Sequence, residues 1–199
     1  MIQIHGVEQN SPEWLKLRSG LPTASMFSAI LAKGEGKTRK SYMNRLASEI
    51  ITGEPCESYT NQYIERGQQM EAEARDYYAF ACNADLTRVG FITNGPKGCS
   101  PDSLIGNNGI LEIKTQRGDL LVETLLKNEF PSEHRAQCQG SLWVAEREWL
   151  DISIYWPKMP TFIKREFRNE AYITNLASEV ARFSDDLAAL VGRLRQYGQ

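Results

Sequence analysis

The C-terminal part of the chain has the clearest pattern, because apolar residues recur there every three or four positions, as on one face of an α-helix. This spacing predicts a helix from about Asn169 to Arg195, with an apolar face made of Ile173, Leu176, Val180, Phe183, Leu187, Leu190 and Leu194. Helical spacing also predicts helices within residues 11–20, 23–31, 37–53, 61–80, 118–130 and 131–144. Ser11-Pro12 marks the start of the first of these, since serine caps helices and proline is favoured in the first turn.

Shorter apolar segments between these helices have the character of β-strands, several of them with alternating apolar and polar residues. Strands are predicted at residues 2–4, 86–93, 149–156 and 162–167, and a β-hairpin at residues 99–116. Strands flanked by helices indicate the α/β fold class. Because no linker, repeat or low-complexity stretch divides the sequence, residues 1–199 are expected to form a single domain.

The predicted hairpin carries the candidate chemistry. Its turn is Gly106-Asn107-Asn108-Gly109, since asparagine and glycine accept the positive φ angles of tight turns. Glu112 and Lys114 are two residues apart on the second arm and therefore point to the same side. Folding back at the turn brings Asp102 near Glu112.

Two interpretations of these charged residues remain open. Two adjacent carboxylates repel each other unless a cation or a proton lies between them, and carboxylate oxygens suit Mg²⁺ or Mn²⁺. The acid spacing alone favours an ordinary surface hairpin with a cross-strand acid and base. The apolar residues around the charges favour a metal site, because charges in an apolar hairpin are costly unless they are used.

Composition and charge narrow the function classes. The chain has 199 residues and a formal net charge of −2, so any contact with nucleic acid must come from local basic patches such as Lys33, Lys37, Arg39 and Lys40. That run is also compatible with a solvated loop. The sequence has no apolar run of the roughly 20 residues that cross a membrane and no signal peptide, so a cytoplasmic protein is expected.

The cysteine spacing and one glycine-rich stretch argue against a zinc site, disulfide bonds and a P-loop. Cys56, Cys82, Cys99 and Cys138 are scattered and form no C-x-x-C pair, which favours reduced thiols over zinc or disulfides. Residues 34–38 resemble the end of a P-loop, but the motif needs glycine where Leu31 stands and a preceding strand, so nucleotide triphosphate binding is not expected here.

A candidate anion site precedes the second helix. Thr23 or Ser25 is expected to cap that helix, and free N–H groups at a helix start can hold a phosphate. Arg18 lies just upstream and could grip the same anion with two hydrogen bonds. Without a ligand, the same residues describe ordinary helix capping with Arg18 in solvent.

Four motifs together carry a resemblance to a known family, and the first of them has two parts. Ser100-Pro101-Asp102 and Leu111-Glu112-Ile113-Lys114 are similar to the PD-(D/E)xK nuclease signature. Three more stretches narrow the resemblance to the YqaJ-like viral recombinases, the family that includes the phage lambda exonuclease: L-R-S-G-L-P-T-A-S at 17–25, G-Q-Q-M-E-A-E-A-R at 67–75 and A-Q-C-Q at 136–139. The resemblance implies a restriction-endonuclease-like core with a central mixed sheet flanked by helices.

The resemblance also implies an activity. It is that of a Mg²⁺-dependent 5′→3′ exonuclease on linear double-stranded DNA, which releases 5′-mononucleotides and leaves a 3′ single-stranded overhang for recombination by strand annealing. It implies two Mg²⁺ per active site, replaceable by Mn²⁺, a ring-shaped homotrimer around the DNA, and a single-strand annealing protein as partner. The host setting would be the cytoplasm of a bacterium that carries a phage or prophage.

The resemblance assigns roles at the metal site. Asp102, Glu112 and the backbone carbonyl of Ile113 would bind Mg²⁺. Lys114 would hold or activate the attacking water. Glu71 would lie near the metal and contact it through water. Gln137 would position Lys114 or the scissile phosphate. From helical spacing alone, Glu71 could instead be an exposed acid paired with Arg75.

It also assigns roles in DNA binding. Arg18 and Ser25, with help from Thr23, would bind the terminal 5′-phosphate, and Ile64 would be an apolar wedge at the duplex end, unless it is a core residue. Two alternative functions remain at this stage, a PD-(D/E)xK endonuclease and a catalytically inert DNA-binding subunit on the same fold.

Overall fold

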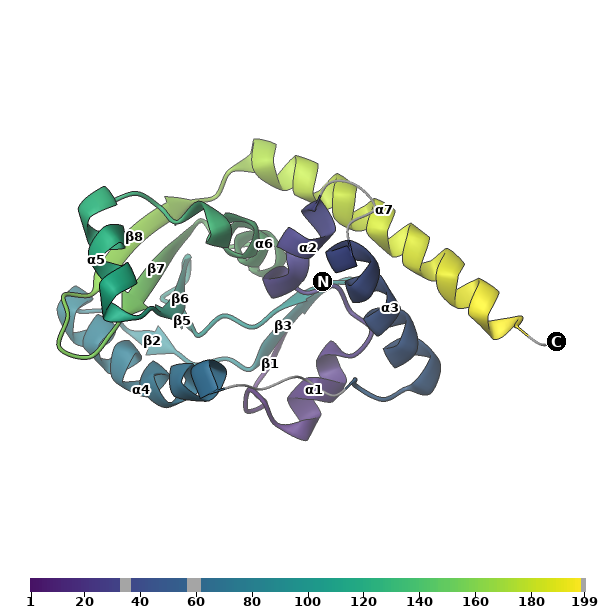
Figure 1. Ribbon diagram of the computed structural model, residues 1–199, viewed down its shortest axis with the longest axis horizontal. Coiled ribbons are helices and arrows are strands. Elements are labelled where there is room, and N and C mark those ends of the chain that lie inside the picture. The colour runs from purple at the N-terminus through teal and green to yellow at the C-terminus, as the bar shows by residue number, and fades with distance from the viewer. Residues whose placement is uncertain (33–36, 57–61, 198–199) are drawn as a thin grey trace.

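The computed structural model describes the backbone of residues 1–32, 37–56 and 62–197, and the side chains of these residues except 62–68. Two sheets lie side by side, with helices over their faces, and the last helix runs along one side of the molecule (Figure 1). The helices are α1 (Pro12–Arg18), α2 (Phe27–Leu31), α3 (Lys37–Thr52), α4 (Gln62–Cys82), α5 (Gly118–Lys127), α6 (Arg135–Ala145) and α7 (Glu170–Arg195), with 3₁₀ turns η1 (Ala24–Met26) and η2 (Ser132–His134). The strands are β1 (Ile2–His5), β2 (Leu86–Thr87), β3 (Phe91–Asn94), β4 (Gly98–Cys99), β5 (Ser103–Ile105), β6 (Gly109–Thr115), β7 (Trp149–Tyr155) and β8 (Phe162–Phe167).

The larger sheet is mixed and has the strand order β2-β5-β6-β7-β8. Strands β6 and β7 are parallel, and the other neighbours in this sheet are antiparallel. The smaller sheet, β1-β3-β4, is antiparallel. This mixed sheet flanked by helices is the predicted fold class, and α2, α3, α6 and α7 share one core cluster with it.

The predicted hairpin forms, but it spans residues 103–115 rather than 99–116, because Cys99 lies in β4 of the smaller sheet. Strands β5 and β6 pair with Ser103 opposite Leu111 and Ile105 opposite Gly109, so the turn is made of Gly106, Asn107 and Asn108. Gly106 has a φ of 50°, as the turn chemistry requires. Continuing this register by one residue places Asp102 opposite Glu112.

The expected strand at residues 86–93 is wrong as a single element. It divides into β2 in the larger sheet and β3 in the smaller one. At Gly90 the N-terminal segment crosses so closely that a Cβ would lie 1.9 Å from the carbonyl oxygen of Val7. Only glycine fits such a crossing, and the chain changes sheets there.

Two helices begin next to a side chain that caps them, the predicted cap Ser11 and, in addition, Asn169. The Ser11 hydroxyl accepts the N–H of Trp14 at 3.2 Å, and the Asn169 side chain accepts the N–H of Tyr172 at 2.9 Å. In contrast, the expected helix at 23–31 begins as a 3₁₀ turn, and no side-chain capping bond from Thr23 forms there. On α7 Leu194 is 45% exposed, and Val191 takes the last core position instead.

A buried polar cluster fastens α4 to the larger sheet. The Tyr78 hydroxyl of α4 donates to Asp151 Oδ2 of β7 at 2.6 Å, and Arg165 of β8 donates to both oxygens of the same carboxylate at 2.8 and 2.9 Å. Asp151 is 4% exposed, and these donors offset the cost of burying its carboxylate. The burial of Tyr78 and its bond to Asp151 raise the pKa of the phenol, which therefore stays protonated as a donor.

We expect Tyr78→Phe to lower the free energy of unfolding by about 1.5–3 kcal/mol, because it removes a hydrogen bond to a buried carboxylate. Urea denaturation would measure the change. Tyr77→Phe is the matched control, since the neighbouring tyrosine is 45% exposed, and it should change stability little. Equal effects of the two substitutions would contradict the anchoring role of Tyr78.

Candidate active site

Three side chains from two elements meet at the second arm of the hairpin. Glu112 and Lys114 project from the same side of β6, and Gln137 comes from α6. The Lys114 ammonium donates to Glu112 Oε1 at 2.8 Å and to Gln137 Oε1 at 3.2 Å. The Gln137 amide also donates to Glu112 Oε1, which closes a ring of hydrogen bonds among the three.

Lys114 is held as an ammonium ion. Burial lowers its pKa, but the charge of Glu112, the hydrogen bond to it and the charge of Asp102 outweigh the burial and raise the pKa above the ordinary value. At neutral pH this lysine therefore provides a fixed positive charge and N–H donors rather than a free base.

Asp102 lies where a carboxylate is costly. Its Oδ2 accepts the backbone N–H of Ile113, which binds it to the strand that carries Glu112. Burial raises the pKa of Asp102 well above its usual range, and the nearby charges of Glu112 and Glu71 raise it further. A cation between these groups would relieve the repulsion.

The donor set fits a divalent cation. Glu112 is 3% exposed, and its Oε2 is buried with no hydrogen-bond partner among the described residues. A buried carboxylate oxygen without a partner is rare, and binding of an ion or a catalytic role is among the usual reasons for one. In the described part of the chain, no three His, Cys, Asp or Glu side chains converge on one point. The Asp102 and Glu112 carboxylates are ligands of the kind that a hard cation takes, and such a cation completes its shell with backbone oxygen or water.

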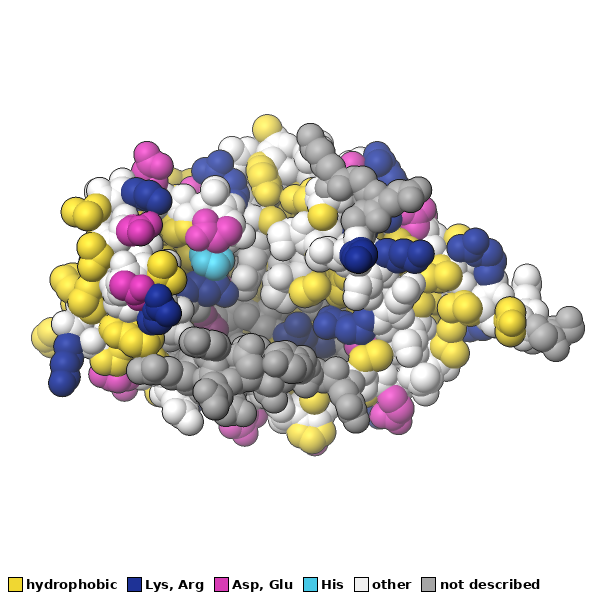
Figure 2. Space-filling view, viewed as in Figure 1, with side chains coloured by type: hydrophobic (Ala, Val, Ile, Leu, Met, Phe, Trp, Pro, Cys, Tyr) yellow, Lys and Arg dark blue, Asp and Glu magenta, His cyan; other side chains and the backbone are white. Residues whose placement is uncertain are grey.

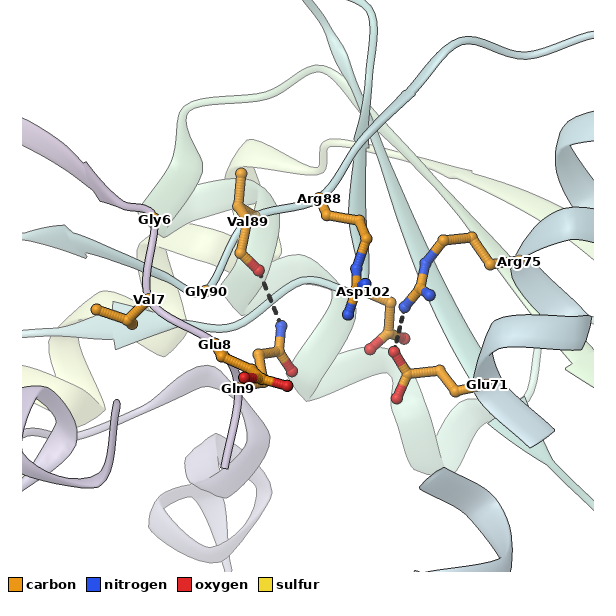
Figure 3. Close-up of a pocket in the computed structure, with 10 residues that line it drawn as sticks. All are labelled: Gly6, Val7, Glu8, Gln9, Glu71, Arg75, Arg88, Val89, Gly90 and Asp102. Atoms are coloured by element: carbon orange, nitrogen blue, oxygen red, sulfur yellow. Dashed lines mark hydrogen bonds and ion pairs between the residues drawn. The ribbon is translucent and has the colours of Figure 1, made fainter. Parts of the chain in front are cut away.

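Glu71 lies on the other side of Asp102. It projects from α4 and forms an ion pair with Arg75 of the next helical turn, as the spacing of four residues allows. Glu71, Arg75 and Asp102 line one cavity of about 280 Å³, and the Arg88 side chain extends into it beside Asp102 (Figure 3). The structure therefore brings Glu71 beside Asp102 and also forms the ion pair that the sequence allowed.

The Arg18 side chain rests on the protein rather than in free solvent. Its guanidinium lies over the Trp14 ring, 3.9 Å from the ring centroid. Burial lowers the pKa of Arg18 to about 10, and the neighbouring Arg45 lowers it while Tyr42 and Glu49 raise it. No ion pair of Arg18 forms among the described residues, so the cation is suited to an anionic ligand.

Tyr42 links Arg18 to the two hydroxyl residues. Its phenol oxygen accepts the backbone N–H of Thr23 at 3.0 Å. The hydroxyl oxygens of Thr23 and Ser25 lie 3.4 Å apart, with Thr23 buried and Ser25 exposed. The helix start from which the sequence predicted an anion seat is thus a 3₁₀ turn, with the hydroxyl groups of Thr23 and Ser25 beside it.

The two sites are joined through Trp14. Its indole N–H donates to the Ser100 hydroxyl and to the carbonyl of Gly90, each at 3.0 Å. Ser100 lies two residues before Asp102, so the ring that supports Arg18 is also tied to the start of the hairpin. In Figure 2 Lys and Arg side chains lie on either side of a hollow at the centre of the face shown.

Some predicted residues fall outside the described part, and some site residues were not predicted. Ile64 lies within α4, but its side chain is outside the described residues, as is Lys33 of the basic run. Gln9 and Arg88 line the cavity beside Asp102 without having been predicted. Both residues lie in loops, and no motif or period in the sequence marks them.

The comparisons with known proteins agree with this geometry. The sequence profile of the YqaJ-like viral recombinase domain matches residues 13–148. The crystal structure of LHK-Exo in complex with dAMP is similar with a TM-score of 0.87 and 28% identity, over 94% of this chain and 97% of that chain. A crystal structure of the alkaline exonuclease LHK-Exo from Laribacter hongkongensis gives a TM-score of 0.85 and 29% identity over the same shares.

A more distant structure shares the fold. It is a phage related exonuclease from Haemophilus somnus 129PT, with a TM-score of 0.69 and 14% identity over 90% of this chain and 99% of that chain. No curated protein sequence matches the chain at a significant level. The expected exonuclease-type fold and the family resemblance are confirmed.

Proposed function

Because the chain belongs to the YqaJ-like viral recombinase family, we propose that it is a Mg²⁺-dependent 5′→3′ exonuclease on linear double-stranded DNA. It releases 5′-mononucleotides and leaves a 3′ single-stranded overhang for recombination by strand annealing. The observation that carries the proposal is the buried, unpartnered Oε2 of Glu112 beside the Lys114 ammonium and Asp102. Nuclease chemistry as such follows from the family and from the similar exonuclease structures.

In this proposal Asp102, Glu112 and the Ile113 carbonyl hold the Mg²⁺, Mn²⁺ can replace it, and Glu71 contributes through water after leaving Arg75. Two bound ions would supply Lewis acidity to the scissile phosphate and lower the pKa of the attacking water. Lys114 orients that water and stabilises negative charge on the phosphate, and Gln137 fixes the lysine in its rotamer by accepting one of its N–H bonds.

In this proposal, the Arg18 site determines the 5′→3′ direction of digestion. Arg18, Ser25 and Thr23 bind the terminal 5′-phosphate, which sets the scissile bond at a fixed distance from that end. The indole of Trp14, bound to both Arg18 and Ser100, holds this distance constant. Ile64 on α4 is proposed as the wedge that separates the strands.

The wider setting is also proposed from the family. Residues 1–199 act as one nuclease domain, since α7 shares the core cluster of the larger sheet. Three copies enclose the DNA as a ring, a single-strand annealing protein receives the overhang, and the reaction occurs in the cytoplasm of a bacterium carrying the phage genes. In the described part of the chain no helix is long and apolar enough to cross a membrane.

One digestion experiment tests the activity, the polarity and the need for an end. Linear duplexes labelled at the 5′ or at the 3′ terminus are incubated with Mg²⁺, beside a covalently closed circle. We expect early release of the 5′ label as a mononucleotide, late release of the 3′ label and an intact circle. Cutting of the circle would indicate the endonuclease alternative, and no Mg²⁺-dependent digestion would indicate an inert DNA-binding subunit.

We expect Arg18→Gln to reduce the preference for 5′-phosphorylated over 5′-hydroxyl ends by roughly 10-fold, since a charge-assisted bond to phosphate is worth about 1.5–3 kcal/mol. Initial rates on the two duplexes measure the ratio. Lys16→Gln, an exposed cation on the same helix, is the control and should keep the preference. An equal loss on both kinds of end would contradict the 5′-phosphate role.

A further inference from the structure

The N-terminal segment closes one wall of the cavity beside Asp102, and Gln9 projects from it (Figure 3). The Gln9 amide nitrogen donates to the carbonyl of Val89 and to the carbonyl of Pro101, each at 3.0 Å. A carboxamide has two N–H bonds, so each carbonyl receives its own hydrogen. One side chain therefore connects the segment before β3 to the residue immediately before Asp102.

Trp14 connects the same two segments, and on each of them it binds the residue next to the one that Gln9 binds. Its indole N–H is shared by the carbonyl of Gly90 and the hydroxyl of Ser100, whereas Gln9 binds the adjacent Val89 and Pro101. The two side chains thus fasten the same two segments to each other. The close crossing of Val7 over Gly90 keeps the N-terminal segment in place above them.

The two connections differ in what else they support. Trp14 also stacks under Arg18, so its replacement would disturb both sites. Among the described residues, the Gln9 side chain donates to two backbone carbonyls, and neither belongs to a residue with a proposed contact to DNA. Gln9 therefore offers a way to change the backbone before Asp102 without removing the support of Arg18.

We propose that Gln9 is a positioning residue that fixes the metal ligand Asp102 through the carbonyl of Pro101. On the C-terminal side of Asp102, strand β5 holds the backbone. On the N-terminal side, the backbone is held at Pro101, whose carbonyl accepts the hydrogen bond from Gln9. Glu112 and Glu71 repel the Asp102 carboxylate, so its backbone would relax away from them if this carbonyl were free. Gln9 holds the backbone before Asp102 in place, while the N–H of Ile113 holds the carboxylate itself.

This inference rests on the proposed metal site, and its test is Gln9→Met, which keeps the length of the side chain but has no donor. Binding of Mn²⁺ without DNA, measured by calorimetry, is expected to weaken by roughly 10-fold, as for other partners that orient metal ligands. The Mg²⁺ concentration for half-maximal digestion should rise by a similar factor. The rate at saturating Mg²⁺ and the preference for 5′-phosphorylated ends should stay close to those of the wild type.

Asn94→Leu is the matched control. The Asn94 amide also bridges two acceptors, the Val144 carbonyl and Glu146 Oε1, but at the other end of β3. It is expected to lower the melting temperature without changing Mn²⁺ binding. If Gln9→Met does not fold, Gln9→Asn keeps the amide but is too short to reach both carbonyls, and it should also weaken Mn²⁺ binding.

Two results would overturn the inference in distinguishable ways. If the wild type binds Mn²⁺ and digests DNA while the Gln9 variants match its metal affinity and lose only thermal stability, Gln9 is purely structural. If the wild type itself binds no Mn²⁺ and digests no DNA, the proposed function fails and the positioning role fails with it.

Discussion

Asp102→Asn is expected to abolish nuclease activity and, at the same time, to stabilise the metal-free protein. The loss of rate should be on the order of 10³-fold or more, about 4 kcal/mol, because a neutral amide is a poor ligand for Mg²⁺. The gain in stability follows because the substitution removes a buried carboxylate that Glu112 and Glu71 repel, while the amide oxygen can still accept the N–H of Ile113.

The raised pKa of Asp102 determines how the stability difference between Asp102→Asn and the wild type changes with pH. A carboxyl whose pKa is raised in the folded protein destabilises the fold at pH values above its unfolded pKa of about 3.9, and not below that value. Without metal, the variant should therefore melt above the wild type at pH 7, and the difference should shrink as the pH falls towards about 4. Calorimetric melting temperatures at several pH values would measure it.

Metal ions should reverse the order of the two melting temperatures. Added Mg²⁺ is expected to raise the melting temperature of the wild type and leave that of Asp102→Asn unchanged, since ligand binding stabilises only the protein that binds it. Asp119→Asn is the control, because Asp119 is exposed and paired with Arg117, and it should keep activity and the response to Mg²⁺. A metal-free Asp102 variant less stable than the wild type at pH 7 would contradict the repulsion.

Lys114→Met is expected to lower the rate at saturating Mg²⁺ by about 10²- to 10³-fold, the usual cost of removing one donor that stabilises transition-state charge. Metal binding should persist or become tighter, because the ammonium no longer competes for Glu112 Oε1. Single-turnover digestion measures the first effect and calorimetry with Mn²⁺ the second.

A lysine elsewhere in the sheet serves as the control for this substitution. Lys164→Met removes an ammonium on β8 that binds the Asn128 carbonyl, and we expect its rate to match that of the wild type. A Lys114 variant that keeps full activity, or one that loses activity only through weaker metal binding, would contradict the role given to the ammonium.

Several elements were predictable because their signals are local. The hairpin follows from Gly106-Asn107-Asn108, whose residues accept the turn geometry wherever they occur. The starts of α1 and α7 follow from Ser11 and Asn169, which bind N–H groups three residues away. Residues 86–93 were not predictable, because their division between two sheets depends on the distant Val7 crossing Gly90.

The sequence by itself determined the hairpin, the shared side of Glu112 and Lys114, and the family, since these depend on neighbouring residues and on motifs in order. The tertiary structure shows the contacts behind two roles that the resemblance implied, because Gln137 meets Lys114 and Glu71 lies beside Asp102. Only the tertiary structure decided that Trp14 and Gln9 join the N-terminal segment to residues 100 and 101. The reason is physical. A turn or a cap is specified by the few residues that form it, whereas a contact between residues about 90 positions apart depends on the packing of the whole core.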